Sequence, residues 1–211
     1  LREVYIKRAS FIGANLSRAY LGKAGLMRAN FAEADLSQAN LKESYLLEAN
    51  FGEANLERAN LRSAYLAGAR FSGANLKAAS LSQAYLLGAD LGRADLTQAN
   101  LIRTSLIRAH MSAANFIGAD LREANLDGAY LRRSNFSGAD LRDSCLKRAN
   151  LREVDLSGVN LNGANVVNTM FGVGIGLSEA EKQDLIRRGA IFEDTPGDDR
   201  LNPLPVASGG R

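Results

Sequence analysis

Large apolar residues recur at every fifth position along most of the chain. They occupy each position whose number ends in 1 or 6, from Leu1 to Phe171, with no insertion. We call each of them the centre of a five-residue unit, as in the stretch 51–75, FGEANLERANLRSAYLAGARFSGAN. The residue two before a centre is Ala in 26 of 34 units, and the exceptions are Val, Ser or Thr, so this position is small throughout.

This period excludes an ordinary helix and a flat strand. In an α-helix a five-residue step turns by about 140°, which spreads the centres over every face. In a flat strand the side-chain period is two, so an odd step sends alternate centres to opposite faces. All the centres point inward only if each unit forms one side of a coil that returns on itself.

A second period gives the number of sides. Phenylalanine and tyrosine each recur at a spacing of twenty, at Phe11, Phe31, Phe51 and Phe71, and at Tyr45, Tyr65 and Tyr85. Four units therefore make one turn, and residues twenty apart are expected to stack. Stacked coils pair backbone to backbone at about 4.8 Å, and parallel crossovers are strongly biased to the right hand. We predict an all-β, right-handed quadrilateral parallel β-helix, a solenoid of about nine coils over residues 1–172.

The repeated unit resembles that of a known family. Units such as Ala74-Asn75-Leu76 and Ala94-Asp95-Leu96 are similar to the A(D/N)LXX signature of the pentapeptide-repeat proteins, over about four fifths of the chain. The resemblance implies a right-handed quadrilateral β-helix and no particular function. The stretch GLSEAEKQDLIRRGAIFEDTPGDD also resembles the tails of soluble cyanobacterial members.

The five-residue rule stops near the C-terminus, where we predict a helical cap over residues 173–193. Ser178 and Glu181 form a capping box that begins a helix over 179–188, which Gly189 ends. Four apolar residues are expected to cover the open end of the core: Leu185, Ile186, Ile191 and Phe192. Residues 194–211, rich in Pro, Gly and Asp, are predicted to form a disordered tail. The N-terminal end shows no comparable cap, so either a further segment completes it or it packs on a partner.

The composition indicates a soluble cytoplasmic protein with no membrane association. No run approaches the ~20 apolar residues of a membrane span, and no signal-peptide core is visible. The only cysteine, Cys145, excludes an intrachain disulfide and reads as a free thiol in a reducing compartment. The chain begins without Met, so removal of a targeting segment stays open.

Catalytic and metal chemistry find no support in the sequence. His110 and Cys145 are too few for a zinc site, and no nucleophile, base and orienting acid come together, so we expect neither an enzyme nor a cofactor. Asn and Asp residues before centres, such as Asp35 and Asn55, are expected to bond corner backbone groups rather than calcium. Glycines such as Gly68 stand two after a centre, where a corner turn needs a positive φ.

Charge tests two binding functions. Some pentapeptide-repeat proteins mimic DNA and bind type II topoisomerases through a strongly acidic face, which is the alternative function for this chain. Residues 1–170 carry 21 Lys and Arg against 16 Asp and Glu, and no column of stacked positions is mainly acidic, so mimicry is disfavoured. Nucleic-acid binding is disfavoured as well, because Glu3, Glu43, Glu123 and Asp143 directly follow four of the cations in the most basic column.

One side of the predicted β-helix does not have a polar surface. Its outward positions hold aromatic and aliphatic residues, which we call the Tyr/Leu face: Met27, Tyr45, Leu47, Tyr65, Tyr85, Leu87 and Ile107. A ladder that only strengthens stacking between coils is the simpler interpretation. The alternative is an interface, which predicts a non-enzymatic scaffold that binds another protein along this side or at one end. A homodimer through an end or through the Tyr/Leu face stays open.

Overall fold

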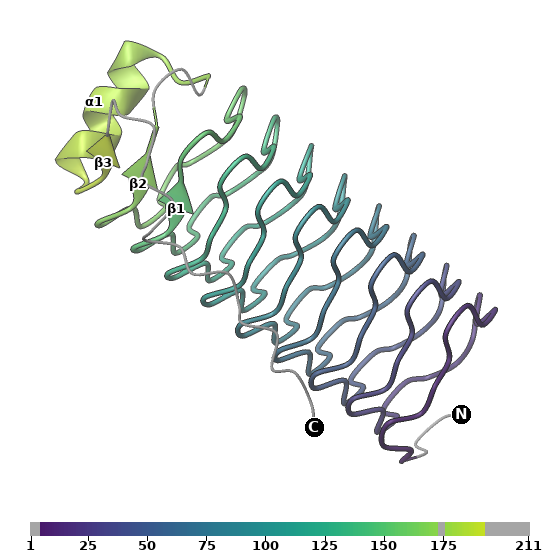
Figure 1. Ribbon diagram of the computed structural model, residues 1–211. Coiled ribbons are helices and arrows are strands. Elements are labelled where there is room, and N and C mark those ends of the chain that lie inside the picture. Colours follow the sequence, from purple (N-terminus) through teal and green to yellow (C-terminus); the bar gives the residue numbers. More distant parts are fainter. Residues whose placement is uncertain (1–4, 173–175, 193–211) are drawn as a thin grey trace.

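The chain winds into a stack of coils that is closed at one end by a helix. Figure 1 shows the computed structural model, which describes residues 5–172 and 176–192. Its elements are β1 (Asn150–Leu151), β2 (Met170–Phe171), α1 (Glu179–Arg187) and β3 (Ile191–Phe192). The predicted tail 194–211 lies outside the described residues, as do parts of the predicted cap. No helix in the described part is long and apolar enough to cross a bilayer.

Pairing between coils follows a register of twenty residues. Parallel bridges join each residue before a centre to the residue twenty further on, from Tyr5 and Gly25 to Cys145 and Asn165. The same register joins β1 to β2, and β3 adds to β2 as the last parallel strand. Each coil therefore holds four units, and the fold is a repeat β-helix.

The interior is built from the centres and the small residues between them. From the second coil onward the centres are almost completely buried, as are the Ala residues two before them. The rings of Phe11, Phe31, Phe51 and Phe71 stack with centroid separations of 4.9, 5.0 and 4.8 Å. The predicted pile of phenylalanines is confirmed, and with it the inward direction of the centres.

The corners use a left-handed residue in every unit. All residues two after a centre, from Arg8 to Asn168, have a positive φ, whether they are glycine or not. The next amide closes the turn, as when Ala54 N–H donates to the Phe51 carbonyl at 3.1 Å. Glycine removes the steric strain of this conformation, but the repeat imposes it on Arg, Glu and Gln as well. The sequence indicated the corner only where glycine marks it.

The C-terminal cap forms largely as predicted. The Ser178 and Glu181 capping box is present, and α1 ends at Arg187, one residue before the predicted end. Leu185 is buried against the core, and the ring of Phe192 stacks on Phe171 at 5.1 Å.

Two of the four predicted cap residues do not cover the core. Ile186 and Ile191 are 45% and 42% exposed. Ile186 follows Leu185 on the helix, so it points about 100° away from it. Ile191 extends the outward column of Met170, since the two pair directly across β2 and β3. Ala190, which is buried, takes the place that these residues were expected to fill.

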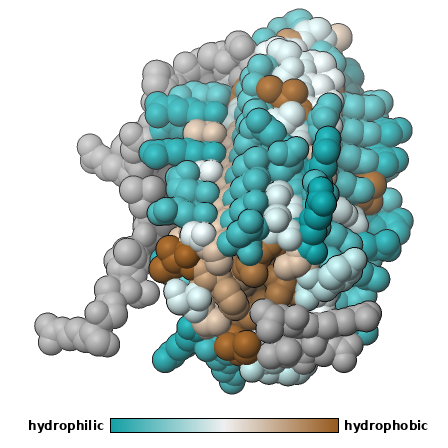
Figure 2. Space-filling view, turned by 90° about the vertical axis from the view of Figure 1, so that its right-hand side faces the viewer, coloured by the Kyte–Doolittle hydropathy of each residue, from teal (hydrophilic) through white to brown (hydrophobic). Residues whose placement is uncertain are grey.

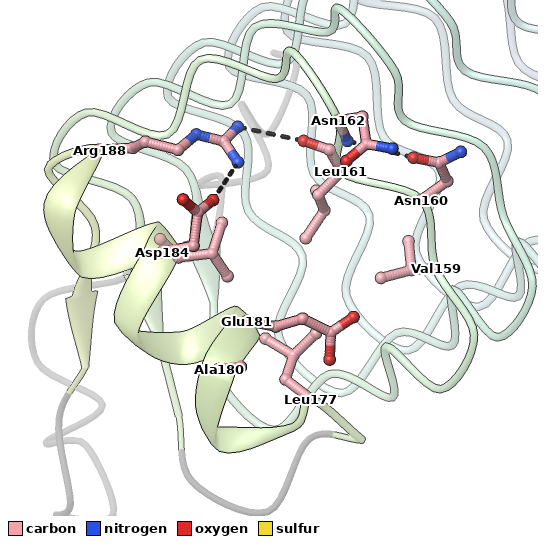
Figure 3. Close-up of a pocket in the computed structure, with 10 residues that line it drawn as sticks. Val159, Asn160, Leu161, Asn162, Leu177, Ala180, Glu181, Asp184 and Arg188 are labelled. Atoms are coloured by element: carbon pink, nitrogen blue, oxygen red, sulfur yellow. Dashed lines mark hydrogen bonds and ion pairs between the residues drawn. The ribbon is translucent and has the colours of Figure 1, made fainter.

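Arg188 completes the cap in a way that the sequence did not reveal. Its guanidinium donates to the carbonyls of Leu161, at 3.1 Å, and Ala164, and it pairs with Asp184 at 3.0 Å (Figure 3). These carbonyls belong to the last coil, where a further coil would normally stack. The guanidinium thus gives the Ala164 carbonyl a donor in place of the amide that the next coil supplies elsewhere, as Asn160 N–H does for Ala139 at 3.0 Å. The Leu161 carbonyl also accepts from the Ala164 amide at 3.2 Å.

The opposite end of the stack is less covered. Figure 2 shows hydrophobic residues gathered at one end of the surface in view, below columns that are mostly hydrophilic. The apolar residues of this end include Ile6 and Ile12, which are 36% and 57% exposed, and Phe11 and Leu16, which are only partly buried.

Candidate protein-interaction face

The three tyrosines of the Tyr/Leu face form a continuous stack on the outside of the coils. Tyr45 and Tyr65 have ring centroids 4.9 Å apart and planes within 2°, and Tyr65 and Tyr85 are 5.2 Å apart and within 7°. Their exposed fractions are 39%, 40% and 51%. Because the rings lie face to face, they present their edges and hydroxyl groups to solvent.

An aliphatic column runs beside the tyrosines. Leu47 and Leu87 are exposed, and Met27, Ala67 and Ile107 are half-buried. All seven residues of the predicted face therefore have outward side chains with part of their surface in solvent. Five successive coils contribute to the face, since its residues repeat at the register of twenty.

Tyr5 extends the face and was missed from the sequence. Its ring lies over Gly25, where an added Cβ would come within 2.2 Å of Tyr5 Cδ1. This position brings the ring to 6.5 Å from that of Tyr45, at a tilt of 30°. The signal was present, because Tyr5, Gly25 and Tyr45 occupy one column. A glycine in the middle of an aromatic column leaves room for a ring from the coil below.

A shallow groove of about 560 Å³ runs along the tyrosines. Its other wall is polar and includes Lys23, Glu43 and Ser63. Lys23 and Glu43 pair at 3.9 Å, and Arg28 pairs with Glu48 at 2.8 Å beside the aliphatic column. The hydrogen bond from Arg28 holds the pKa of Glu48 below its ordinary value. The rim therefore carries charges that are paired with opposite charges beside them.

Backbone hydrogen bonding also distinguishes this face. Elsewhere an Asn or Asp before the centre accepts from the amide two residues on, as Asn55 does from Glu57 at 3.2 Å and Asp95 from Thr97 at 3.0 Å. The predicted bonding of corner backbone groups is confirmed. Along the Tyr/Leu face, no side chain of the described residues accepts from the amides of Leu47, Ala67 or Leu87. Tyrosine cannot make this short contact.

Other candidate residues have contacts within the fold. His110 is half-buried, and its ring stacks on Tyr130 at 4.7 Å. A pocket of about 550 Å³ lies between α1 and the last coil (Figure 3). Its acidic groups are engaged, since Glu181 bonds Ser178 in the capping box and Asp184 pairs with Arg188.

Comparisons with known proteins agree with the geometry. A family model described as pentapeptide repeats matches in eight copies, over residues 9–46, 24–62, 44–83, 74–112, 109–148 and 134–171. None of the curated proteins matches the chain.

Several solved structures are similar to the chain. HetL, a pentapeptide repeat protein involved in heterocyst differentiation regulation from the cyanobacterium Nostoc sp. strain PCC 7120, is 33% identical, with 80% of this chain and 87% of HetL covered and a TM-score of 0.57. A second Nostoc pentapeptide repeat protein, alr5209, is 32% identical over 49% of this chain and 84% of its own, with a TM-score of 0.45. QnrB1, a plasmid-mediated fluoroquinolone resistance protein, is 19% identical over 88% and 98% of the two chains, with a TM-score of 0.44. From the eight repeat matches and the likeness to HetL, the chain belongs to the pentapeptide repeat family.

Proposed function

We propose that the protein is a non-enzymatic scaffold, a right-handed quadrilateral β-helix of about nine coils, that binds another protein through the Tyr/Leu face. The observation that carries the proposal is the stacked, partly exposed tyrosine column beside an aliphatic column over five coils. Exposed apolar patches of this kind are typical of interaction sites. Tyrosine supplies contact area with little loss of side-chain entropy.

An interface explains two features that a purely structural ladder does not. Ring stacking accounts for the tyrosines alone, whereas Leu47 and Leu87 expose aliphatic surface without any ring to support. The face also lacks the Asn or Asp acceptors found before other centres, and each such hydrogen bond contributes about 0.5–1.5 kcal/mol. Apolar residues here therefore replace a stabilising feature of the repeat.

Family membership supports a scaffold rather than an enzyme. HetL is involved in regulation of heterocyst differentiation, and a regulatory role fits a rod that presents side chains at fixed spacing. The only cysteine, Cys145, is a free thiol, which supports a reducing, cytoplasmic compartment.

Site-specific photocrosslinking tests the proposal. A photoreactive phenylalanine analogue at position 65 is expected to crosslink a protein from native extract, and the same analogue at position 117, one residue after Phe116 on another side, is expected to capture none. Unlabelled protein that carries both Tyr65→Ser and Leu87→Glu is expected to compete poorly with crosslinking from position 65. Unlabelled Ile117→Glu protein is expected to compete like the wild type. Equal capture at both positions would reject the Tyr/Leu face as the interface.

DNA mimicry is tested separately. A gyrase supercoiling assay is expected to show neither inhibition nor protection, because Lys and Arg outnumber Asp and Glu in the repeat. Inhibition at stoichiometric protein would restore that alternative.

A further inference from the structure

We propose that the partner that fits the Tyr/Leu face is a second copy of this chain, packed side by side and antiparallel about a two-fold axis level with Tyr65 and Ala67. The inference rests on the proposed function of this face, and it names the occupant. Because a two-fold contact uses the same surface on both copies, that surface must be complementary to itself. The order of residues along the face meets this requirement.

The aliphatic column reads nearly the same in both directions. Along the stack it runs Lys7, Met27, Leu47, Ala67, Leu87, Ile107, Asp127. A two-fold axis through the coil of Ala67 places Leu47 of one copy opposite Leu87 of the other. The same axis pairs Met27 with Ile107, so apolar residues meet apolar residues throughout. Ala67 meets itself on the axis, where a small side chain allows close approach.

The ends of this column carry opposite charges. The axis that pairs the aliphatic residues brings Lys7 of one copy opposite Asp127 of the other, and it does so twice. Asp127 also pairs with Arg148 at 2.5 Å, so Lys7 of the other copy joins a carboxylate that already has one cation beside it. Lys7 is exposed. Opposite charges at both ends favour this register over a shift by one coil.

The tyrosine column has the same symmetry. It runs Gly25, Tyr45, Tyr65, Tyr85, Ser105, with Tyr65 in the middle. The ring of Tyr5 fills the space over Gly25, so at this end the axis brings Tyr5 opposite the small Ser105 of the other copy. The axis therefore sets Tyr45 against Tyr85 of the other copy and Tyr65 against itself. The edges and hydroxyl groups of the rings meet their counterparts, which allows edge contacts and hydrogen bonds between phenols.

The geometry of the stack makes the two columns match over their full length. Neighbouring rings are 4.9 and 5.2 Å apart and nearly parallel, so the face turns little from one coil to the next. The coils lie over one another along the stack (Figure 1). A second copy has the same spacing by construction, and its residues stay in register over five coils. A partner with another repeat length would lose register within a few coils.

The rim is compatible with this arrangement. The two-fold axis places like charges of the two copies opposite one another, Lys23 opposite Arg103 and Arg28 opposite Arg108. Three of these cations have a carboxylate of their own: Lys23 pairs with Glu43, Arg28 with Glu48 and Arg103 with Glu123. Repulsion between neutralised, exposed pairs is weak and is screened by salt.

Charge exchange on the full chain tests the register. Sedimentation equilibrium is expected to show a concentration-dependent dimer for the wild type. Lys7→Glu and Asp127→Lys proteins each place like charges at both ends, and each is expected to raise the dimer dissociation constant about tenfold or more. An equimolar mixture of the two restores the dimer, because both contacts then join opposite charges. A mixture no tighter than the separate variants would overturn the antiparallel register.

A cysteine on the proposed axis tests the contact directly. In a Cys145→Ser background, Ala67→Cys is expected to form a disulfide-linked dimer with diamide, because two copies of the same position meet only on the axis. The matched control is Ala32→Cys, also half-buried and one residue after a centre, which is expected to stay monomeric. Equal crosslinking of both proteins would overturn the proposal.

The two proposals fail in different ways. A wild-type chain that stays monomeric at every concentration would overturn the second copy as occupant, while photocrosslinking from position 65 to another protein would still support the interaction face. Loss of that crosslinking together with a monomeric chain would remove both proposals. A dimer that survives Tyr65→Ser with Leu87→Glu uses another surface, which also overturns the inference.

Discussion

Two sides of the same coils differ in their outer columns and share their interior. On one side the residues before the centres are Asn15, Asp35, Asn55, Asn75 and Asp95, and on the Tyr/Leu face they are mainly tyrosine. Beneath both, the centres Leu66 and Leu76 are fully buried. The Asn and Asp side chains bond the backbone and one another, as Asn75 does to Asn55 at 3.0 Å, whereas the tyrosines stack and remain exposed.

This difference separates what the fold requires from what it tolerates. A buried centre, a small residue and a left-handed corner recur on every side, so they are requirements of the coil. The outward position before a centre accepts Asn, Asp, Ser, Tyr, His or Cys. The β-helix therefore tolerates different outward residues, and under our proposal the identity of these residues decides which side meets a partner.

The largest predicted effect tests the shared interior. Leu66→Ala and Leu76→Ala are each expected to lower the free energy of unfolding by about 2–5 kcal/mol, through lost burial and a cavity. Both values should be similar, because both side chains are fully buried in equivalent positions. Urea denaturation measures them. A much smaller loss under the tyrosines would show that the two sides differ inside as well.

A smaller loss of stability is predicted for the column of hydrogen-bonded Asn and Asp residues, which we call the polar ladder. Asn55 accepts from the amide of Glu57 and from Asn75, and it donates to Asp35 at 3.2 Å. Asn55→Ala removes these bonds and is expected to cost about 1–2 kcal/mol. The control is Glu57→Ala, which keeps the backbone amide and is expected to change stability by less than about 0.5 kcal/mol. Equal values for the two variants would contradict a structural role for the ladder.

The sequence predicted the parts of the structure that repeat. Phe11, Phe31, Phe51 and Phe71 stack because a period of twenty leaves no other arrangement, and Ser178 begins α1 because a capping box is a local signal. The outward direction of Tyr45, Tyr65 and Tyr85 followed from the same period.

The parts that the sequence did not reveal depend on single contacts at the ends. The side chain of Arg188 reaches back 27 residues to Leu161, which no local pattern encodes. The choice of Leu185 over Ile186 depends on the rotation of α1 against the last coil, and both residues are equally apolar. Tyr5 lies over Gly25 because of a gap in three dimensions. The left-handed corners were hidden because most of them are not glycine.

Acid is predicted to lower the stability that the Asn and Asp residues of the polar ladder contribute. The amide and hydroxyl of Ser37 and the amide of Asn55 hold the pKa of Asp35 below its ordinary value of 3.8. The folded chain thus binds this proton less readily than the unfolded chain. The stabilisation is fully present above about pH 5 and is lost as the pH falls below 3.8 toward the folded pKa.

Urea midpoints measured between pH 6 and pH 3 check this expectation. Asp35→Asn is expected to flatten the fall in stability toward low pH, and Ser37→Ala, which removes only the hydroxyl, flattens it less. A profile for Asp35→Asn that parallels the wild type would show that Asp35 does not contribute to the acid sensitivity.

The smallest effect on stability is predicted where the effect on association is large. Tyr65→Asn gives the Tyr/Leu face the residue that the other sides use. It removes ring stacking worth about 0.5–1.5 kcal/mol and adds an acceptor for the amide of Ala67 worth a similar amount. The free energy of unfolding of the monomer is therefore expected to change by less than about 1 kcal/mol, as measured by urea denaturation at low protein concentration.

The same variant separates the two interpretations of the tyrosines. If the column serves only to join coils, Tyr65→Asn and Tyr130→Asn should behave alike, because Tyr130 also stacks on a ring, that of His110, on another side. If the column is an interface, only Tyr65→Asn abolishes self-association and competes poorly, as unlabelled protein, with crosslinking from position 65. A Tyr65→Asn protein that self-associates and competes like the wild type would show that the tyrosines are not an interface, since a binding surface cannot lose its central ring without consequence.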